Sequence, residues 1–196
     1  MSFDLVVAGV GGQPVDRVVE LLAAVAEAAG QPFTSTAPRG VLELGGPRLA
    51  QVSIGECWSS IVTEDTGELL LALESGEALR AVRYCARGGA ALVDRVRTPP
   101  AGLRSPESYP EADAVESAVR ELVPRTVGAD FGDIARAGGA PPESRHAALL
   151  GAASALASMK MLAPGWGPGL EAAGATDAEQ KAFAAGAAWV KEQGVA

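Results

Sequence analysis

The chain has 196 residues, and its 16 lysines and arginines against 24 aspartates and glutamates give a formal net charge of −8. An acidic balance of this size has no electrostatic footprint for a nucleic-acid backbone or an anionic membrane surface, so we expect neither partner. Hydrophobic residues make up 48% of the chain, as in a folded globular domain. The two cysteines and one histidine are too few for an iron–sulfur cluster or a zinc site built by this chain alone.

The N-terminal residues do not read as a targeting signal. Residues 1–10 hold Asp4 and no basic region, and their apolar run is shorter than a signal peptide requires. No stretch reaches the roughly 18–20 uninterrupted apolar residues of a membrane span. We therefore expect a cytoplasmic protein, and in that reducing compartment we expect no disulfide between Cys57 and Cys85.

A strand, a glycine turn and a helix are predicted to open the chain. Residues 3–8 are apolar and rich in β-branched side chains, which is typical of a strand buried on both faces. Apolar residues then recur at three- and four-residue spacing over residues 14–29, which predicts a helix, and Gly30 fits the position that ends it. Residues 31–47 hold prolines and glycines without clear periodicity and are predicted as a loop.

The remaining elements alternate between strands and helices. Residues 48–54 alternate polar and apolar side chains, and 57–62 is the predicted hairpin partner of that strand. Further strands are predicted over 68–73, 88–94 and 126–130. Helices are predicted over 75–87, 112–122, 147–162 and 177–193, and a short helix begins at residue 133. The last helix opens with a capping box formed by Thr176 and Glu179. The alternation predicts a parallel or mixed α/β sheet in one domain over residues 1–196, with the proline-rich residues 97–111 as a surface loop.

The motif with most chemical information is Gly9-Val10-Gly11-Gly12-Gln13-Pro14, between the first strand and the first helix. A glycine turn there lets backbone amides approach a ligand, and the helix N-terminus favours an anion. The spacing follows the dinucleotide-binding G-x-G-x-x-G except that Pro14 replaces the last glycine, and no acid follows about twenty residues later to bind a ribose. A ligand-binding loop and a tight turn that only connects two elements both stay open as interpretations.

Other candidate residues do not complete a catalytic set. Asp94 and Asp130 each follow a predicted strand, where open α/β sheets place functional groups, although acids there also cap helices. His146 has no candidate second ligand and is interpreted as a cap or packing residue. Cys57 and Cys85 lack the cationic or C-x-x-C context of reactive thiols. Core or interface anchoring is the interpretation for Trp58, Trp166 and Trp189.

Four stretches in order carry a family resemblance: FDLVVAGVGGQ at 3–13, LLLALESGEALRAVRYCARGG at 69–89, GADFGDIARAGGAPPESRHAALLGAAS at 128–154 and KAFAAGAAWV at 181–190. Together they resemble the small subunit of indolepyruvate:ferredoxin oxidoreductases, equivalent to the gamma domain of pyruvate and other 2-oxoacid:ferredoxin oxidoreductases. The resemblance implies a three-layer α/β domain with a mostly parallel sheet and a Rossmann-like opening. It also implies a complex that oxidatively decarboxylates 2-oxoacids, often arylpyruvates, to acyl-CoA and passes electrons to ferredoxin.

The same resemblance implies how cofactors and partners are divided. Thiamine diphosphate and the iron–sulfur clusters belong to the large subunit, and coenzyme A joins them in the assembled complex. No cofactor or metal is expected on this chain alone, and its expected partners are that large subunit and, through it, ferredoxin or another electron acceptor. The small number of cysteines agrees with this division.

The resemblance places two glycine loops of this chain near the approach of coenzyme A and substrate. The candidate binding residues are Gly11, Gly12 and Gln13 in the first loop and Arg39, Gly40, Gly45 and Gly46 in the second, with Arg48 as a further phosphate partner. Two departures from the family pattern fall in these loops. Pro14 replaces a glycine, and the acid, histidine, glutamine and arginine of the second loop are replaced by Ala37, Arg39, Glu43 and Leu44.

Three functional hypotheses follow. The first is the small, non-catalytic subunit of an indolepyruvate or related 2-oxoacid oxidoreductase, inactive in isolation. The second is a diverged scaffold or regulatory binding module that kept the fold and lost the active-site loop, and the replaced loop at 37–46 motivates it. The third, an independent dinucleotide-dependent oxidoreductase, rests only on Gly9, Gly11 and Gly12.

Overall fold

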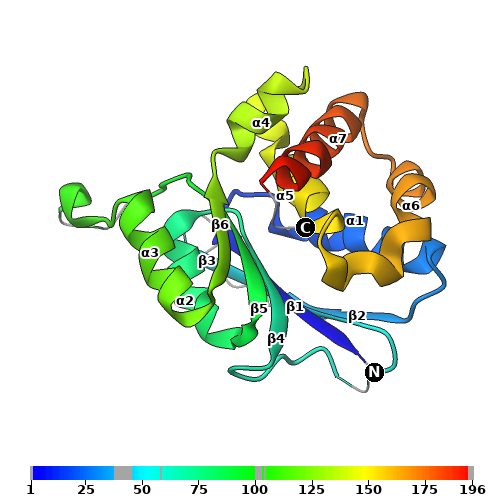
Figure 1. Ribbon diagram of the computed structural model, residues 1–196, viewed down its shortest axis with the longest axis horizontal. Helices are drawn as coiled ribbons and strands as arrows, with labels where there is room; N and C mark the ends of the chain where they lie inside the picture. The colour runs from blue at the N-terminus through cyan, green and yellow to red at the C-terminus, as the bar shows by residue number, and fades with distance from the viewer. Residues whose placement is uncertain (1, 38–45, 58, 100–102, 104, 194–196) are drawn as a thin grey trace.

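A six-stranded mixed sheet runs through the molecule in the order β2-β3-β1-β4-β5-β6 (Figure 1). The computed structural model describes residues 2–37, 46–57, 59–99, 103 and 105–193. The strands are β1 (Phe3–Val10), β2 (Phe33–Thr36), β3 (Pro47–Ile54), β4 (Gly67–Ala72), β5 (Cys85–Asp94) and β6 (Arg125–Ala129). Strands β1, β4, β5 and β6 are parallel neighbours, whereas β3 runs antiparallel to both β1 and β2. The prediction of a mostly parallel sheet is therefore confirmed.

Helices cover both faces of this sheet. They are α1 (Val15–Ala28), α2 (Ser75–Ala81), α3 (Ala112–Leu122), α4 (Phe131–Ala137), α5 (Arg145–Ser154), α6 (Trp166–Ala172) and α7 (Asp177–Glu192). Figure 1 shows α2 and α3 on one face and α1, α5, α6 and α7 on the other, with α4 packed against α5 and α7. The three-layer α/β architecture is confirmed.

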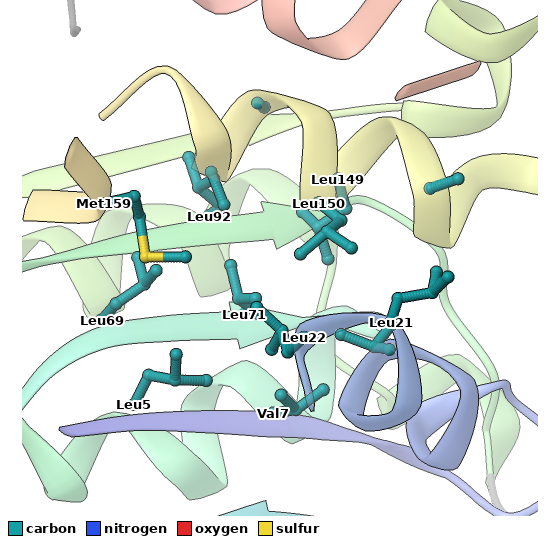
Figure 2. Close-up of a cluster of buried hydrophobic side chains, with 14 of the residues drawn as sticks. Leu5, Val7, Leu21, Leu22, Leu69, Leu71, Leu92, Leu149, Leu150 and Met159 are labelled. Carbon is teal, nitrogen blue, oxygen red and sulfur yellow. The ribbon is translucent and has the colours of Figure 1, made fainter. Parts of the chain in front are cut away.

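Each face of the central strands is buried against one helical layer. Leu5 and Val7 of β1 point toward α1 and α5, as Figure 2 shows, where they meet leucines of β4 and Leu149 and Leu150 of α5. Val6 and Ala8, one residue along, belong to the cluster under α2 and α3. Burial on both faces explains why the strand has no polar alternation. Each fully buried leucine of this kind contributes about 1.5–3 kcal/mol to stability.

The helix ends that the sequence predicted are present. Gly30 has a φ of +68° and follows α1, and the Gln31 N–H donates to the Ala26 carbonyl at 2.9 Å, as in a glycine-terminated helix. Helix α7 opens with the capping box: the Thr176 hydroxyl accepts from the Glu179 N–H, and the Glu179 carboxylate accepts from the Thr176 N–H.

Two predictions about strands are wrong. Strand β3 has antiparallel partners on both sides, β1 and β2, so the segment predicted over 57–62 is not its hairpin partner, and the described residues of that segment form no strand. The region predicted as a loop over 31–47 contains β2, a short edge strand. Because its last three residues are polar and exposed, β2 lacks the alternation that identifies a half-buried strand.

Two predicted helices are too long. The helix from residue 75 ends at Ala81, and a 3₁₀ turn leads into β5 at Cys85, so Gly88 and Gly89 lie inside the strand instead of preceding it. The helix predicted over 147–162 ends at Ser154, because Leu156 takes an extended conformation and a 3₁₀ segment over Ala157–Gly165 follows. That segment is also buried, and periodicity alone does not separate two consecutive buried segments from one helix.

Within the part of the chain that the structure describes, no single helix is both long and apolar enough to cross a membrane. The pair Pro142–Ser154 and Ala157–Ala172 reaches that length only together and is bent by 110°.

Candidate functional site

The loop between β1 and α1 makes a tight left-handed turn at Gly12. Its φ is +95°, a conformation that side-chain-bearing residues rarely adopt, and the Gln13 N–H donates back to the Val10 carbonyl at 3.0 Å. A Cβ added at Gly12 would meet nothing within 4 Å. The backbone conformation, and not lack of space, therefore requires glycine at this position.

The Gln13 side chain joins the ends of two parallel strands. Its Oε1 accepts from the Val10 N–H at 2.9 Å, and its Nε2 donates to the Leu73 carbonyl, just after β4, at 2.9 Å. A Cβ on Gly9 would stand 2.8 Å from that Oε1, so the small residue at position 9 makes room for the amide. Gln13 thereby fixes the position of the glycine loop relative to β4.

Most backbone amides of the loop are already used inside the protein. The Gly11 N–H donates to the Gly46 carbonyl at 2.7 Å, the Gln13 N–H to Val10, and the Val15 N–H to the Gln13 carbonyl at 2.8 Å. Pro14 has no N–H and stands at the N-cap of α1, one residue before the first helical position. An anion at this loop therefore depends mainly on the α1 dipole and on a side-chain cation.

Arg48 supplies that cation. Antiparallel pairing places Arg48 of β3 opposite Gly9 of β1, and its guanidinium Nη2 donates to both carboxylate oxygens of Asp16, at 2.8 and 2.9 Å. The Arg48 side chain is only 11% exposed, whereas Asp16, in the first turn of α1, is 49% exposed. The pair joins β3 to α1, and it also makes the Asp16 carboxylate a competitor for any anion that binds Arg48.

These residues line one small hollow at the carboxyl end of β1. Its volume is about 130 Å³, and its lining residues are Gly11, Gly12, Gln13, Asp16 and Arg48. That volume holds on the order of four water molecules at liquid density, which suits a phosphate or carboxylate group but not an entire coenzyme A. The donors therefore fit the anionic end of such a ligand and leave the rest of it to a partner chain.

The structure brings together part of the predicted binding set. Gly46 of the second loop lies against the first loop, as the Gly11–Gly46 hydrogen bond shows, and Arg48 of β3 lines the same hollow as Gly11–Gln13. Arg39, Gly40 and Gly45 lie outside the described residues. Across the described ranges, no group of three or more histidine, cysteine, aspartate or glutamate side chains could hold a metal ion, and Cys57 and Cys85 are free thiols.

Asp94 and Asp130 act as structural groups at the ends of β5 and β6. The fully buried Asp94 carboxylate accepts two hydrogen bonds from Arg145 Nη1, both at 3.1 Å, and burial raises its pKa to about 6 although Arg145 lowers it. Asp130 caps α4 by accepting from the Asp133 N–H at 3.0 Å. Arg145 lies 3.6 Å from Asp130 as well, so the two acids hold the start of α5 against the sheet.

His146 packs in a buried polar cluster, as the sequence interpretation proposed. Its Nε2 lies 3.0 Å from Glu179 Oε1, and Arg17 of α1 donates to both oxygens of the same carboxylate, at 2.9 and 3.1 Å. Hydrogen bonding from Arg17 holds the pKa of Glu179 well below its usual range. The cluster links α1, α5 and α7 and leaves its groups engaged with each other.

Sequence reasoning missed Glu74, which binds Thr98 and Tyr109, two described residues of the proline-rich stretch. This fully buried carboxylate follows β4, caps α2 through the Glu77 N–H at 2.8 Å, and accepts from the Thr98 N–H and the Tyr109 hydroxyl, both at 3.0 Å. Burial and the adjacent Glu74 charge raise the pKa of Tyr109 above its usual range. Glutamate is not among the preferred N-cap residues, so its position carried no recognisable signal.

Comparison with known proteins decides the family. The family model described as "Pyruvate ferredoxin/flavodoxin oxidoreductase" matches residues 4–189. The chain belongs to this family. Among curated members, the chain is 28% identical over 140 residues to the indolepyruvate oxidoreductase subunit IorB of Archaeoglobus fulgidus, covering 71% of this chain and 70% of that one.

Solved structures of the family share the fold. The gamma subunit of a keto/oxoacid ferredoxin oxidoreductase from Geobacter sulfurreducens superimposes with a TM-score of 0.63 at 18% identity, covering 97% of this chain and 99% of that one. The 2-oxoglutarate:ferredoxin oxidoreductase of Magnetococcus marinus, solved with 2-oxoglutarate, coenzyme A and succinyl-CoA bound, gives a TM-score of 0.65 at 19% identity. The match covers 97% of this chain but 31% of that one, so the fold here corresponds to one part of a longer polypeptide.

Proposed function

We propose that this chain is the small, gamma-type subunit of a 2-oxoacid:ferredoxin oxidoreductase complex that acts on an arylpyruvate such as indolepyruvate and releases an acyl-CoA. The family match over residues 4–189 and the similarity to an indolepyruvate oxidoreductase subunit support this assignment. The hollow at Gly11, Gly12 and Arg48 is the feature of this chain that carries it, because a cation beside a glycine loop at a strand end suits an anionic cofactor.

In this proposal the partner subunit would hold thiamine diphosphate and iron–sulfur clusters, which would supply the decarboxylation and electron-transfer chemistry. The small subunit positions coenzyme A. Arg48 binds an anionic group of the coenzyme, the turn at Gly12 lets that group approach the backbone, and Gln13 holds the turn against β4. Asp16 releases Arg48 when the anion binds. The affinity for coenzyme A therefore depends on how much more strongly the Arg48 guanidinium binds the anionic group than it binds the Asp16 carboxylate.

A diverged scaffold or regulatory module is the second candidate. The Asp16 carboxylate already occupies Arg48, and the sequence of the second loop has lost the arginine of the family pattern. In such a protein the hollow would be closed permanently, and the chain would contribute only an interaction surface.

Reconstitution of the complex distinguishes the subunit assignment from the scaffold. The chain is co-expressed with a large 2-oxoacid oxidoreductase subunit of the same organism, purified anaerobically, and assayed for reduction of a viologen dye that requires both indolepyruvate and coenzyme A. We expect activity that depends on both subunits. A complex that assembles, and whose large subunit is equally active without this chain, would support the scaffold instead; failure of the two chains to associate would refute both the subunit assignment and a scaffold for that partner.

A further inference from the structure

Arg17, in the first turn of α1, uses every N–H group of its guanidinium inside the protein. Its Nε and Nη2 donate to the two carboxylate oxygens of Glu179, at 2.9 and 3.1 Å. The other N–H groups donate to Glu20 at 2.8 Å and to the carbonyls of Ala173 and Gly174, at 3.1 and 3.4 Å. A guanidinium carries its N–H donors in one rigid plane, so this set of partners fixes both the position and the orientation of the group.

Most of these bonds join α1 to the connection between α6 and α7. Ala173 and Gly174 follow the last residue of α6, and Glu179 belongs to the capping box of α7. The Glu179 carboxylate also accepts from the Thr176 N–H at 2.8 Å, and His146 Nε2 lies 3.0 Å from it. The main acceptor for the guanidinium is therefore itself held in place by α5 and α7.

Close packing attaches the last part of α1 to α6, beside which it lies (Figure 1). A Cβ on Gly165 would overlap the Val25 carbonyl, and a Cβ on Gly169 would overlap the Val25 Cα. Val25 stands about 12 Å along the helix axis from Arg17, at 1.5 Å per residue. Because α1 is attached at both of these points, its direction as well as its position is fixed relative to α6 and α7.

The turn of α1 that Arg17 holds is also part of the proposed coenzyme site. Asp16, the preceding residue, lines the hollow with Gly12 and binds Arg48. In the proposed function the anion displaces Asp16 from Arg48, which opens a link between β3 and α1. Pro14 at the N-cap has no polar side chain with which to fix the start of the helix. The bonds of Arg17 do not involve Arg48, so they persist when that link opens.

We propose that Arg17 is a positioning residue of the anion site: through Glu179 and the end of α6, it holds the first turn of α1 and the loop at Gly12 beside Arg48 while coenzyme A is bound. This inference rests on the proposed function, because it takes the ligand from there. It adds that the affinity for coenzyme A depends on a side chain that does not line the hollow.

Matched variants test the positioning role in the complex with the large subunit. Arg17→Gln removes the charge and the paired bonds to Glu179, whereas Arg17→Lys keeps the charge but cannot make both bonds in the same geometry. Arg95→Gln is the control. Arg95 also donates from Nε and Nη2 to a carboxylate that is 9% exposed, that of Glu116, at 3.2 and 2.7 Å, but it follows β5 and does not line the hollow. Thermal unfolding of each free variant verifies that it folds.

Isothermal titration gives the Kd of each complex for coenzyme A, and steady-state kinetics give the KM values and kcat. We expect Arg17→Gln to raise the Kd and the KM for coenzyme A at least about fivefold, with kcat and the KM for indolepyruvate within about twofold of wild type. Arg17→Lys should raise them less, and Arg95→Gln should leave them within about twofold of wild type. An unchanged Kd in Arg17→Gln, or an equal rise in Arg95→Gln, would overturn the positioning role.

Combination with Arg48→Ala shows whether Arg17 acts through the anion site. If it does, adding Arg17→Gln to Arg48→Ala should raise the Kd by less than about twofold, because the group that Arg17 positions the loop against is already gone. Effects that multiply in full would overturn the inference. If Arg17→Gln does not fold, Arg17→Lys takes its place in the same comparison. Wild-type affinity in Arg48→Ala would overturn the anion site and this inference with it, and a wild-type complex without coenzyme-dependent activity would overturn the proposed function itself.

Discussion

Arg48 is the residue on which the proposed anion site depends, and Asp16 is its competitor. In the reconstituted complex, Arg48→Ala should raise the KM for coenzyme A about tenfold or more with little change in kcat, because a charge-assisted hydrogen bond contributes about 1.5–3 kcal/mol. Asp16→Asn should have the opposite effect and lower the KM for coenzyme A, since it weakens the group that competes for Arg48. Steady-state kinetics with varied coenzyme A measure both.

Arg136→Ala provides the matched control for Arg48, because it removes an equally charged group on α4, away from the hollow. Its KM for coenzyme A should stay at the wild-type value. A raised KM for both Asp16→Asn and Arg48→Ala would mean that the ion pair itself, as a link between β3 and α1, is what the complex needs. That result would argue against Arg48 as the anion partner.

Asp94 should make stability fall as pH rises through the weakly acidic range. Burial raises its pKa to about 6 in the folded chain, from 3.8 for an ordinary aspartate. Between these two values the unfolded chain loses the proton first, so the stabilising contribution of Asp94 is complete below about pH 4 and is lost by about pH 6. The difference of about two pKa units corresponds to about 3 kcal/mol.

Asp94→Asn isolates this contribution from that of Glu179, whose lowered pKa acts in the opposite direction. Urea unfolding of both proteins at pH 4, 5, 6 and 7 gives the wild-type free energy of unfolding minus that of the variant. We expect this difference to decrease by up to about 3 kcal/mol from pH 4 to pH 6 and then to level off. A difference that grows with pH would mean that the Arg145 charge, and not burial, controls Asp94.

At the scale of elements, helices α5 and α7 pack so closely that only glycine fits at two positions of their contact. A Cβ on Gly186 would overlap the Ala148 carbonyl of α5, and a Cβ on Gly151 would overlap the Phe183 carbonyl of α7. Gly186→Ala should therefore lower the free energy of unfolding by about 1–3 kcal/mol, although alanine is the better helix former. Chemical denaturation measures the change.

Gly167→Ala in α6 is the control for that substitution, because a Cβ there meets nothing within 4 Å. It should leave stability unchanged or raise it by up to about 1 kcal/mol. Equal effects of the two substitutions would mean that α5 and α7 can separate slightly without cost, and the close approach would then not be a constraint on the fold.

Elements with local signals were predictable from the sequence, and elements defined by distant contacts were not. Helices α1, α3 and α7 have amphipathic spacing or caps within their own residues. Strand β2 exists because β3 offers it a pairing edge, which its own four residues do not encode. Helix α2 ends where a 3₁₀ turn leads the chain into β5, and α5 ends where the chain continues into the buried 3₁₀ segment Ala157–Gly165.

The candidate site divides in the same way. The turn at Gly12 was predictable, because left-handed backbone selects glycine. The bond between Arg48 and Asp16 was not, because it requires β3 to run antiparallel to β1 so that Arg48 lies opposite Gly9. The predicted hairpin between β3 and residues 57–62 gave no reason to expect Arg48 beside the glycine loop. Because the strand pairing was wrong, the ion pair between Arg48 and Asp16 was not predicted.

At the scale of the whole molecule, the chain has few means to bind coenzyme A without a partner. Its net charge of −8 opposes an anionic ligand, the hollow measures about 130 Å³, and Asp16 already holds the cation. We expect the isolated chain to bind coenzyme A with a Kd weaker than about 1 mM, equivalent to less than about 4 kcal/mol of binding free energy. The complex should bind it at least about tenfold more tightly, because the partner supplies the rest of the contact surface.

Isothermal titration of coenzyme A into the isolated chain and into the complex tests this, and titration into the isolated large subunit completes the comparison. If the large subunit alone binds as tightly as the complex, the hollow at Arg48 takes no part in coenzyme binding. If the isolated small chain binds in the micromolar range, it is a binding module in its own right, and the scaffold or regulatory interpretation gains the support that the subunit assignment loses. Only affinity that appears on assembly, and falls in the Arg48→Ala complex, places one end of the coenzyme on this chain.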